Sequence, residues 1–271
     1  MPSVVHLQGR SIMPTSDNIK TYEKEGGMAI LDLQESFART LAIFAAIYVL
    51  CIVSALLAFR LYVVLPNRVT NARVTPPSVT EQHVRTTPAA LLVVLGSGGH
   101  TKEMLTMLQG LEPLRYRPLV FVRAESDARS EGMVKAALPP PSELPSSSVS
   151  FSKPDYVLTV PRSRSVGQSW LTTPLTTLRA LAASVALVAR LQPDVILCNG
   201  PGTCIPICAA GYILRFLGVK HVKIIFVESF CRVTTLSLTG KLLYWAADRF
   251  LVQWPGLRDK YPQAEYLGQL C

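Results

Sequence analysis

One long apolar segment dominates the pattern of hydrophobic and polar positions along the chain. Residues 41–59 carry no charge and are flanked by Arg39 and Arg60. A helix of this length spans roughly 28 Å at about 1.5 Å per residue, close to the thickness of a bilayer's hydrocarbon core. A core helix of a soluble domain rarely lacks a polar face over such a length, and a cleaved signal peptide lies closer to the N-terminus. The pattern predicts a single transmembrane anchor over residues 37–65.

The segments on either side of this anchor are polar. Residues 1–36 are assigned no fold, because Gly26 and Gly27 are expected to interrupt any helix. Residues 66–88 are rich in Thr, Pro and Val without a helical period, which predicts a linker.

Strand-like and helix-like segments alternate from residue 89 onward. A continuously apolar run at residues 89–95 is followed by glycine and is typical of a buried parallel strand. The Pro- and Ser-rich residues 125–154 are interpreted as a flexible excursion. The alternation predicts an α/β fold, a Rossmann-like doubly wound parallel sheet over residues 89–271. Further strands are expected at residues 118–122, 156–160, 195–198, 222–227 and 249–252, and helices at 101–110, 171–191, 203–217 and 238–247, with a short helix or turn near the C-terminus.

The size of this domain bears on function. Residues 89–271 suffice for one Rossmann-like domain, whereas an enzyme that works between two such domains needs nearly twice that length. If the domain belongs to that class of enzyme, half of its active site lies on another chain.

Net charge and cysteine usage indicate which partners and which cellular compartment suit the globular part. The formal net charge of +9 suits contact with an anionic membrane surface or a phosphorylated substrate. Nucleic acid is disfavoured as a partner, because the chain has no dense Lys/Arg run and no interleaved aromatic stripe. Basic residues flank the anchor evenly, so they barely decide its orientation. The absence of an N-x-[ST] sequon and the expected burial of four free thiols favour a cytosolic globular part; these thiols are Cys198, Cys204, Cys208 and Cys231.

A glycine-rich loop follows the first predicted strand. Glycines permit a tight turn and a close approach to a ligand, and the N–H groups at the start of the next helix favour a phosphate. The alternative is a plain turn in which Thr101 caps the helix. The loop is neither a complete dinucleotide fingerprint nor a P-loop. Its candidate phosphate-binding residues are Gly96, Ser97, Gly98, Gly99 and Thr101, and His100 at its mouth is a candidate general base.

A second loop of this kind follows the strand expected at 195–198. Because the carboxyl ends of parallel strands share one edge of the sheet, the two loops are expected to define a cleft. Avoidance of steric clash around Pro201 is the simpler explanation of its glycines. Its candidate ligand-binding residues are Asn199, Gly200, Gly202 and Thr203.

Two further candidates lie beyond other strands. Glu228 ends the strand expected at 222–227, where a carboxylate could accept sugar hydroxyls or orient a base, or form a salt bridge with Arg232. Arg162 and Arg164 could bracket phosphates, although a solvated basic loop explains such a pair equally well.

Several ordered segments carry a family resemblance that covers nearly all of residues 91–271. The chain resembles the asparagine-linked glycosylation protein fourteen family, the membrane-anchoring subunit of the dolichol-pathway UDP-N-acetylglucosamine transferase. Residues 1–36, 66–88 and 125–154 match nothing specific. The segments are LGSGGHTKEML, PRSRSVGQSW, CNGPGTCIP, KIIFVESFCRV, LSLTGKLLY, ADRFLVQWP and YLGQL.

The resemblance implies a fold similar to the N-terminal, acceptor-binding half of a GT-B glycosyltransferase. It implies a small separate partner, of the asparagine-linked glycosylation protein thirteen type, that binds the donor UDP-GlcNAc. The pair would transfer the second N-acetylglucosamine to GlcNAc-diphosphodolichol at the cytosolic face of the endoplasmic reticulum, with the nuclear envelope as a possible further location. Transfer in this superfamily inverts the anomeric centre without a metal, so no metal or cofactor is expected, and this chain alone is expected to be inactive.

The resemblance also assigns roles to individual residues. The two glycine loops would hold the acceptor diphosphate, and His100 and Glu228 would be catalytic. The C-terminal Gln269, Leu270 and Cys271 would contact the partner subunit. The apolar residues 180–189 would either help to hold the domain at the membrane or form a core helix.

Two other functions compete with this interpretation. The chain could be a recruiter only, docking a complete catalytic protein to the membrane. It could also be a membrane-anchored dinucleotide-dependent reductase, with Glu125 as the ribose-binding acid. The missing third glycine and the absence of a Tyr-x-x-x-Lys pair argue against the reductase.

Overall fold

A computed structural model of the chain describes residues 16–66, 87–109, 111, 115–137, 157–163, 168–169 and 171–271. The chain divides into two compact units, Met1–Arg60 and Leu61–Cys271. The linker predicted at 66–88 lies almost entirely outside the described residues, and residues 138–154 of the predicted excursion lie outside them too.

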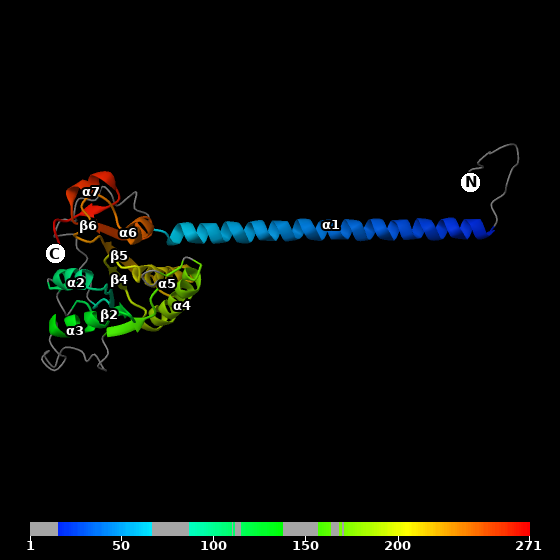
Figure 1. Ribbon diagram of the computed structural model, residues 1–271. Coiled ribbons are helices and arrows are strands. Elements are labelled where there is room, and N and C mark those ends of the chain that lie inside the picture. Colours follow the sequence, from blue (N-terminus) through cyan, green and yellow to red (C-terminus); the bar gives the residue numbers. More distant parts are fainter. Residues whose placement is uncertain are drawn as a thin grey trace. The chain divides into compact units, whose positions relative to one another are not determined.

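All described residues of the N-terminal unit lie in one long helix. The helix, α1, runs from Ser16 to Val64, and its part from Leu33 onward reaches a mean hydropathy of 2.7 (Figure 1). That part is long and apolar enough to cross a membrane, as the sequence predicted. The prediction that Gly26 and Gly27 interrupt any helix was wrong, because α1 continues through both. A glycine costs only about 1 kcal/mol relative to alanine inside a helix.

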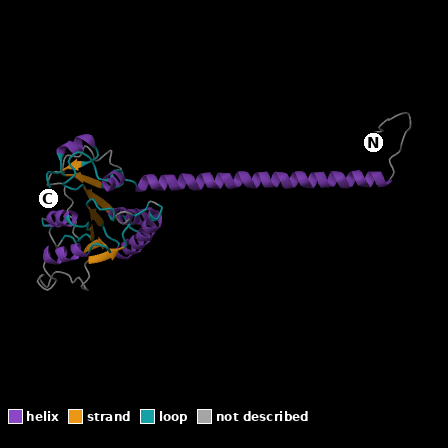
Figure 2. Ribbon diagram, viewed as in Figure 1, coloured by secondary structure: helices purple, strands orange, loops and turns teal. Residues whose placement is uncertain are grey.

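The globular unit is a seven-stranded parallel sheet covered by helices on both faces, so the predicted doubly wound α/β fold is confirmed (Figure 2). The strand order is β3-β2-β1-β4-β5-β6-β7, and the chain moves outward in opposite directions from β1 and from β4. The strands are β1 (Leu91–Val94), β2 (Leu119–Ala124), β3 (Val157–Val160), β4 (Val195–Cys198), β5 (Lys223–Val227), β6 (Arg249–Val252) and β7 (Glu265–Tyr266). The helices are α2 (Gly99–Leu108), α3 (Ala128–Ala137), α4 (Thr173–Leu191), α5 (Cys204–Phe216), α6 (Leu238–Leu243) and α7 (Pro255–Lys260).

The continuously apolar strands contribute to two hydrophobic clusters, one on each face of the sheet. In β1, Leu91 and Val93 pack with α2 and α3, whereas Leu92 and Val94 join the cluster beneath α5. This division follows from the alternation of side chains along a strand. Figure 1 places α2 and α3 on one side of the sheet and α4 and α5 on the other.

Three local expectations needed correction. Residues 128–137 form α3, although they fall within the predicted flexible excursion. The first helix of the globular unit, α2, begins at Gly99 rather than at Thr101. Cys231 is exposed, whereas Cys198, Cys204 and Cys208 are buried as predicted. Burial raises the pKa of the Cys204 thiol, because it disfavours the thiolate.

Candidate functional site

The two glycine loops touch each other at the carboxyl edge of the sheet. A Cβ atom added to Gly96 would lie 2.9 Å from Cγ of Pro201, in the second loop. Gly200 has a φ of 75°, and a Cβ there would lie 2.5 Å from Cε1 of His100. Only glycine satisfies both the backbone conformation and the close approach at position 200. The predicted meeting of the two loops at one rim is therefore confirmed.

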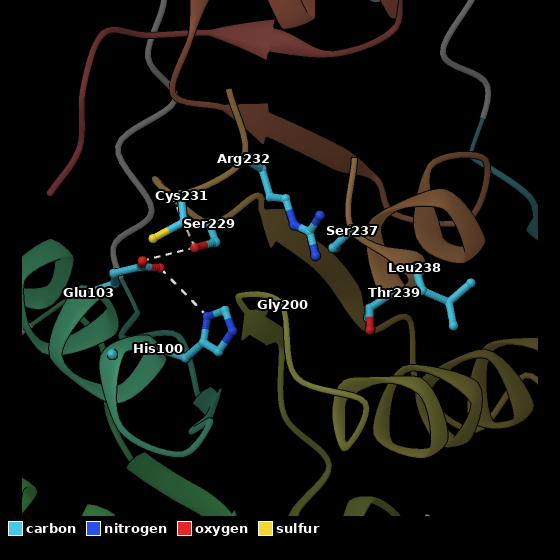
Figure 3. Close-up of a pocket in the computed structure, with 10 residues that line it drawn as sticks. His100, Glu103, Gly200, Ser229, Cys231, Arg232, Ser237, Leu238 and Thr239 are labelled. Atoms are coloured by element: carbon cyan, nitrogen blue, oxygen red, sulfur yellow. Dashed lines mark hydrogen bonds and ion pairs between the residues drawn. The ribbon is translucent and has the colours of Figure 1, made fainter. Parts of the chain in front are cut away.

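A cavity of about 510 Å³ opens at this meeting point. It lies beyond the carboxyl ends of β1, β4 and β5, next to the place where the chain's outward direction changes, which is where ligands of open α/β sheets bind. Figure 3 shows its residues converging from α2, from the second loop and from the segment after β5. The cavity is lined by Gly99, His100, Glu103, Gly200, Ser229, Cys231, Arg232, Ser237, Leu238 and Thr239.

His100, the predicted base, lies in this cavity. Its imidazole packs against Gly200, and its side chain keeps 35% of its surface exposed. The Nδ1 atom is 3.7 Å from Oε2 of Glu103 (Figure 3). The ring is therefore both held by the protein and accessible to a ligand.

Glu103 is a residue of the site that the sequence analysis missed. Its Oε1 accepts a hydrogen bond from Oγ of Ser229 at 2.8 Å, and its Oε2 accepts one from Nδ2 of Asn199 at 3.1 Å. The carboxylate thus ties α2 to the turns after β4 and β5. Its position three residues after His100 on a helix was the available signal, because residues at that spacing share a face.

Glu228 does not face the cavity. Its side chain is fully buried, where Oε1 accepts the Ser229 N–H at 3.1 Å and Oε2 accepts the Ser237 N–H at 2.9 Å. A Cβ added to Gly240 would collide with the same carboxylate. The sequence suggested that Glu228 either faces a ligand or forms a salt bridge with Arg232. In the structure its carboxylate does neither, because it is buried and accepts hydrogen bonds from the main chain. Burial raises its pKa, against the opposing effect of the hydrogen bonds from Ser237 and Ser229.

Polar residues of the two loops brace the site rather than line it. Thr101 is fully buried and hydrogen-bonds to the Gly96 carbonyl and to Ser130. Asn199 is also buried and donates to the carbonyl of His100 at 3.1 Å. These contacts hold the loops in place. Neither the Thr101 hydroxyl nor the Asn199 amide lines the cavity.

The remaining loop residues divide by exposure. Gly99 and Gly200 present backbone to the cavity. Exposed loop residues outside the lining are Ser97, Gly98 and Gly202, and Thr203 is buried at the start of α5.

The predicted arginine pair lies elsewhere, and a different arginine lines the cavity. Arg162 is exposed, and its Nη1 lies 3.4 Å from Oγ of Ser126. Arg164 falls outside the described residues. Arg232, which the sequence analysis considered only as a salt-bridge partner of Glu228, extends its guanidinium into the cavity (Figure 3).

The C-terminal residues lie against their own domain. The N–H of Leu270 and the thiol of Cys271 both contact Oε1 of the buried Gln253, at 3.2 Å and 3.1 Å, while Gln269 is exposed. Nε2 of Gln253 donates to the Glu228 carbonyl at 3.1 Å. The end of the chain is thus linked to the turn that carries Arg232.

Within the described ranges, no cluster of three or more His, Cys, Asp or Glu side chains could hold a metal ion. The cavity lining offers a histidine, a carboxylate, a guanidinium, the hydroxyl residues Ser229, Ser237 and Thr239, the thiol of Cys231, and backbone groups from two glycine loops.

Comparison with known proteins identifies the family. A family model described as "Oligosaccharide biosynthesis protein Alg14 like" matches residues 91–270. The chain belongs to this family. The protein named UDP-N-acetylglucosamine transferase subunit ALG14 from Rattus norvegicus is 46% identical over 180 residues, covering 66% of this chain and 82% of the relative. The subunit of that name from Schizosaccharomyces pombe is 50% identical over 181 residues, covering 66% and 81%.

Family membership makes this chain a glycosyltransferase subunit, and a subunit implies a partner chain. Among solved structures, MurG of Acinetobacter baumannii aligns with a TM-score of 0.45 and 14% identity, covering 62% of this chain and 43% of that one. The matched residues 91–270 contain every residue of the cavity.

Proposed function

We propose that this chain is the acceptor-binding and membrane-anchoring subunit of a heteromeric UDP-N-acetylglucosamine transferase. Its acceptor would be GlcNAc-diphosphodolichol, and the product would carry the second N-acetylglucosamine of the N-glycan precursor. The observation that carries the proposal is the position of the His100 imidazole, which packs on Gly200 in a cavity that Arg232 also lines. The His100 imidazole, which can accept a proton, and the positively charged Arg232 side chain thus share one site.

The diphosphate of the acceptor is held by the Arg232 guanidinium and by backbone groups of the two glycine loops. Gly99 and Gly200 leave room for a phosphate to approach the main chain, and Gly99 is the first residue of the ten-residue helix α2. The unpaired N–H groups and the dipole at a helix start favour an anion. The Arg232 guanidinium supplies charge-assisted hydrogen bonds from the opposite wall.

His100 is the general base of the transfer. The acceptor hydroxyl oxygen attacks C1 of the donor sugar, the bond from C1 to the UDP oxygen breaks, and UDP leaves with the electron pair. The hydroxyl proton passes to the imidazole, and attack from the face opposite the leaving group inverts the anomeric centre. A positioned base contributes about 10²–10⁴-fold to such a reaction. The proposal requires no metal or cofactor, and the donor is bound mainly by the partner.

The membrane holds the acceptor and the site together. A lipid diphosphate with a long hydrocarbon tail stays in the bilayer, because each buried CH₂ stabilises it by about 0.8 kcal/mol. The apolar part of α1 anchors the chain in the endoplasmic reticulum membrane, with the globular unit in the cytosol. A second contact involves the exposed residues Leu171, Leu175 and Leu178, which adjoin the predicted residues 180–189. In that stretch Ala180, Ser184 and Val188 are buried.

The partner is a small donor-binding subunit of the asparagine-linked glycosylation protein thirteen type, which this chain recruits to the membrane. In the proposed pair, the parallel sheet of this chain provides the acceptor-binding wall of the active site and the partner provides the donor-binding wall. The exposed Gln269 and the neighbouring Leu270 and Cys271 contribute to that contact, with Gln253 holding them from behind.

Co-expression with the candidate small subunit tests the proposal. The pair should transfer sugar from UDP-GlcNAc to a GlcNAc-diphospholipid, and either subunit alone should not. His100→Ala should leave the pair assembled and reduce transfer by at least about 10²-fold. If the soluble partner alone transferred sugar to a water-soluble acceptor analogue, and His100→Ala changed nothing, the chain would be a recruiter only. Binding of a nicotinamide cofactor would instead support the reductase.

A further inference from the structure

Glu103 occupies the first turns of α2, on the helix face that also carries His100. Its side chain is 15% exposed and lines the cavity. On the basis of the proposed function, we infer that Glu103 is the positioning residue of the transferase: it holds His100 in the tautomer that carries its proton on Nδ1, so that Nε2 accepts the proton of the acceptor hydroxyl.

Two donors from separate loops fix the Glu103 carboxylate. Oε1 accepts from Ser229 Oγ at 2.8 Å and Oε2 accepts from Asn199 Nδ2 at 3.1 Å. Asn199 also donates to the His100 carbonyl, so the same amide ties the main chain of the base to the carboxylate beside it. A carboxylate offers about four lone-pair positions, and two hydrogen bonds leave it free to accept another.

The remaining accepting capacity of Glu103 lies next to Nδ1 of His100. Oε2 is 3.7 Å from that nitrogen, which is buried and makes no hydrogen bond to any described residue. Catalytic hydrogen bonds are often long in the absence of ligands and shorten when the substrate binds. The ring packs closely on Gly200, where an added Cβ would lie 3.0 Å from Nδ1 and 3.2 Å from Nε2, so glycine at this position lets the imidazole lie beside Glu103.

The chemical consequence follows from the two forms of a neutral imidazole. One ring nitrogen carries a proton and the other a lone pair, and a neighbouring acceptor selects which. A carboxylate at Nδ1 favours the Nδ1–H form, which leaves the lone pair on Nε2. When Nε2 takes the hydroxyl proton, the imidazolium that forms is stabilised by the negative charge of Glu103. The carboxylate takes up no proton in this step, so the proton count balances.

The first test is spectroscopic and needs no substrate. Nitrogen-15 spectra of the full-length chain in detergent report the tautomer of each neutral histidine, and the chain has only four histidines. The His100 signals are those missing from His100→Ala. The wild-type chain should contain mainly the Nδ1–H form, and Glu103→Gln should shift His100 toward the Nε2–H form. An unchanged tautomer in Glu103→Gln would overturn the inference, whatever the pair catalyses.

The second test is kinetic and uses the reconstituted pair. Glu103→Gln should lower kcat by roughly 10²-fold and change the acceptor KM by less than about threefold, because the base is misdirected rather than the ligand lost. Glu103→Asp, which keeps the charge, should recover part of the loss. The matched control is Glu131→Gln on α3, where the carboxylate pairs with Arg123 and Lys135 outside the cavity. It should retain wild-type kcat.

The outcomes separate this inference from the proposed function. If Glu103 were only a structural brace, Glu103→Gln would lower the melting temperature and alter KM and kcat together without affecting the tautomer. That result would overturn the inference and leave the transferase intact. If the wild-type pair transferred no sugar, the proposed function would fail, while the tautomer comparison would still decide what Glu103 does to His100.

Discussion

The beginning of α2 and the turn after β5 each carry a glutamate near the carboxyl edge of the sheet, and the two carboxylates have opposite surroundings. Glu103 lines the cavity and receives hydrogen bonds from side chains of two other loops. Glu228 is fully buried and receives hydrogen bonds from main-chain N–H groups at residues 229 and 237. The first is placed to act on a ligand-facing group, and the second is placed to hold a turn. A carboxylate at the carboxyl edge of a sheet is therefore not by position alone a catalytic group.

The largest effect on activity is expected from Gly200→Ala. The methyl group would collide with the His100 ring and would require an unfavourable positive φ. A displacement of about 1 Å at a reacting group costs on the order of 10²-fold, so transfer by the pair should fall at least that far. Steady-state rates of the reconstituted pair provide the measurement.

The matched control for that variant is Gly202→Ala in the same loop, where an added Cβ meets nothing within 4 Å. It should transfer sugar at nearly the wild-type rate. Equal losses in the two variants would mean that the loop, rather than its contact with His100, limits activity.

Glu228→Ala should act on stability, in contrast to Glu103→Gln. It removes the acceptor for buried N–H groups of Ser229 and Ser237, and an unsatisfied buried donor costs about 1–3 kcal/mol. The melting temperature of the purified chain should fall clearly for Glu228→Ala and little for Glu103→Gln. A stable but inactive Glu228→Ala variant would reverse the roles assigned to the two carboxylates.

Arg232→Gln should raise the acceptor KM by roughly tenfold or more, with a smaller effect on kcat. Hydrogen bonds to charged groups contribute about 1.5–3 kcal/mol. Arg162→Gln is the control, because that exposed arginine lies outside the cavity lining. Titration of the acceptor at saturating UDP-GlcNAc measures both variants, and a larger KM effect at Arg162 would shift the anion site to the predicted arginine loop.

The smallest effect expected is a pH dependence of stability that comes from Glu228. Burial raises its pKa above the ordinary 4.5, so between that value and the raised one the folded chain binds the proton more tightly than the unfolded chain. The stability contributed by this group is therefore lost as pH rises through that window. The melting temperature of the wild-type chain should fall relative to Glu228→Gln from about pH 4.5 upward. Parallel curves for the two proteins would contradict the raised pKa.

Much of the fold could be predicted from the sequence, because the strands are short apolar runs with glycine or proline near their ends. The meeting of the two glycine loops followed from the parallel sheet alone. Helix α3 was missed because only Ser130 and Val134 of its ten residues are buried, which leaves little apolar periodicity. Strand β7 was missed because its two residues gain their conformation by pairing with β6.

The cavity was harder to predict, because its composition depends on long-range contacts. The direction of Glu228 is decided by Ser237, nine residues later, and by the tight approach of Gly240. The role of Glu103 depends on Ser229, which is distant in sequence. The positions of the strand ends in the sequence were enough to predict which edge of the sheet carries the site. Whether a side chain there faces the cavity or the core depends on hydrogen-bond partners that only the structure identifies.

Equilibrium binding to the full-length chain without its partner tests the central claim most directly. The probe is a short-chain GlcNAc-diphospholipid, compared with UDP-GlcNAc on the wild-type chain, Gly200→Ala and Arg232→Gln. The chain should bind the diphospholipid well above UDP-GlcNAc, and both variants should weaken that binding. Preference for UDP-GlcNAc, or diphospholipid binding that neither variant changes, would contradict an acceptor site built from these two loops.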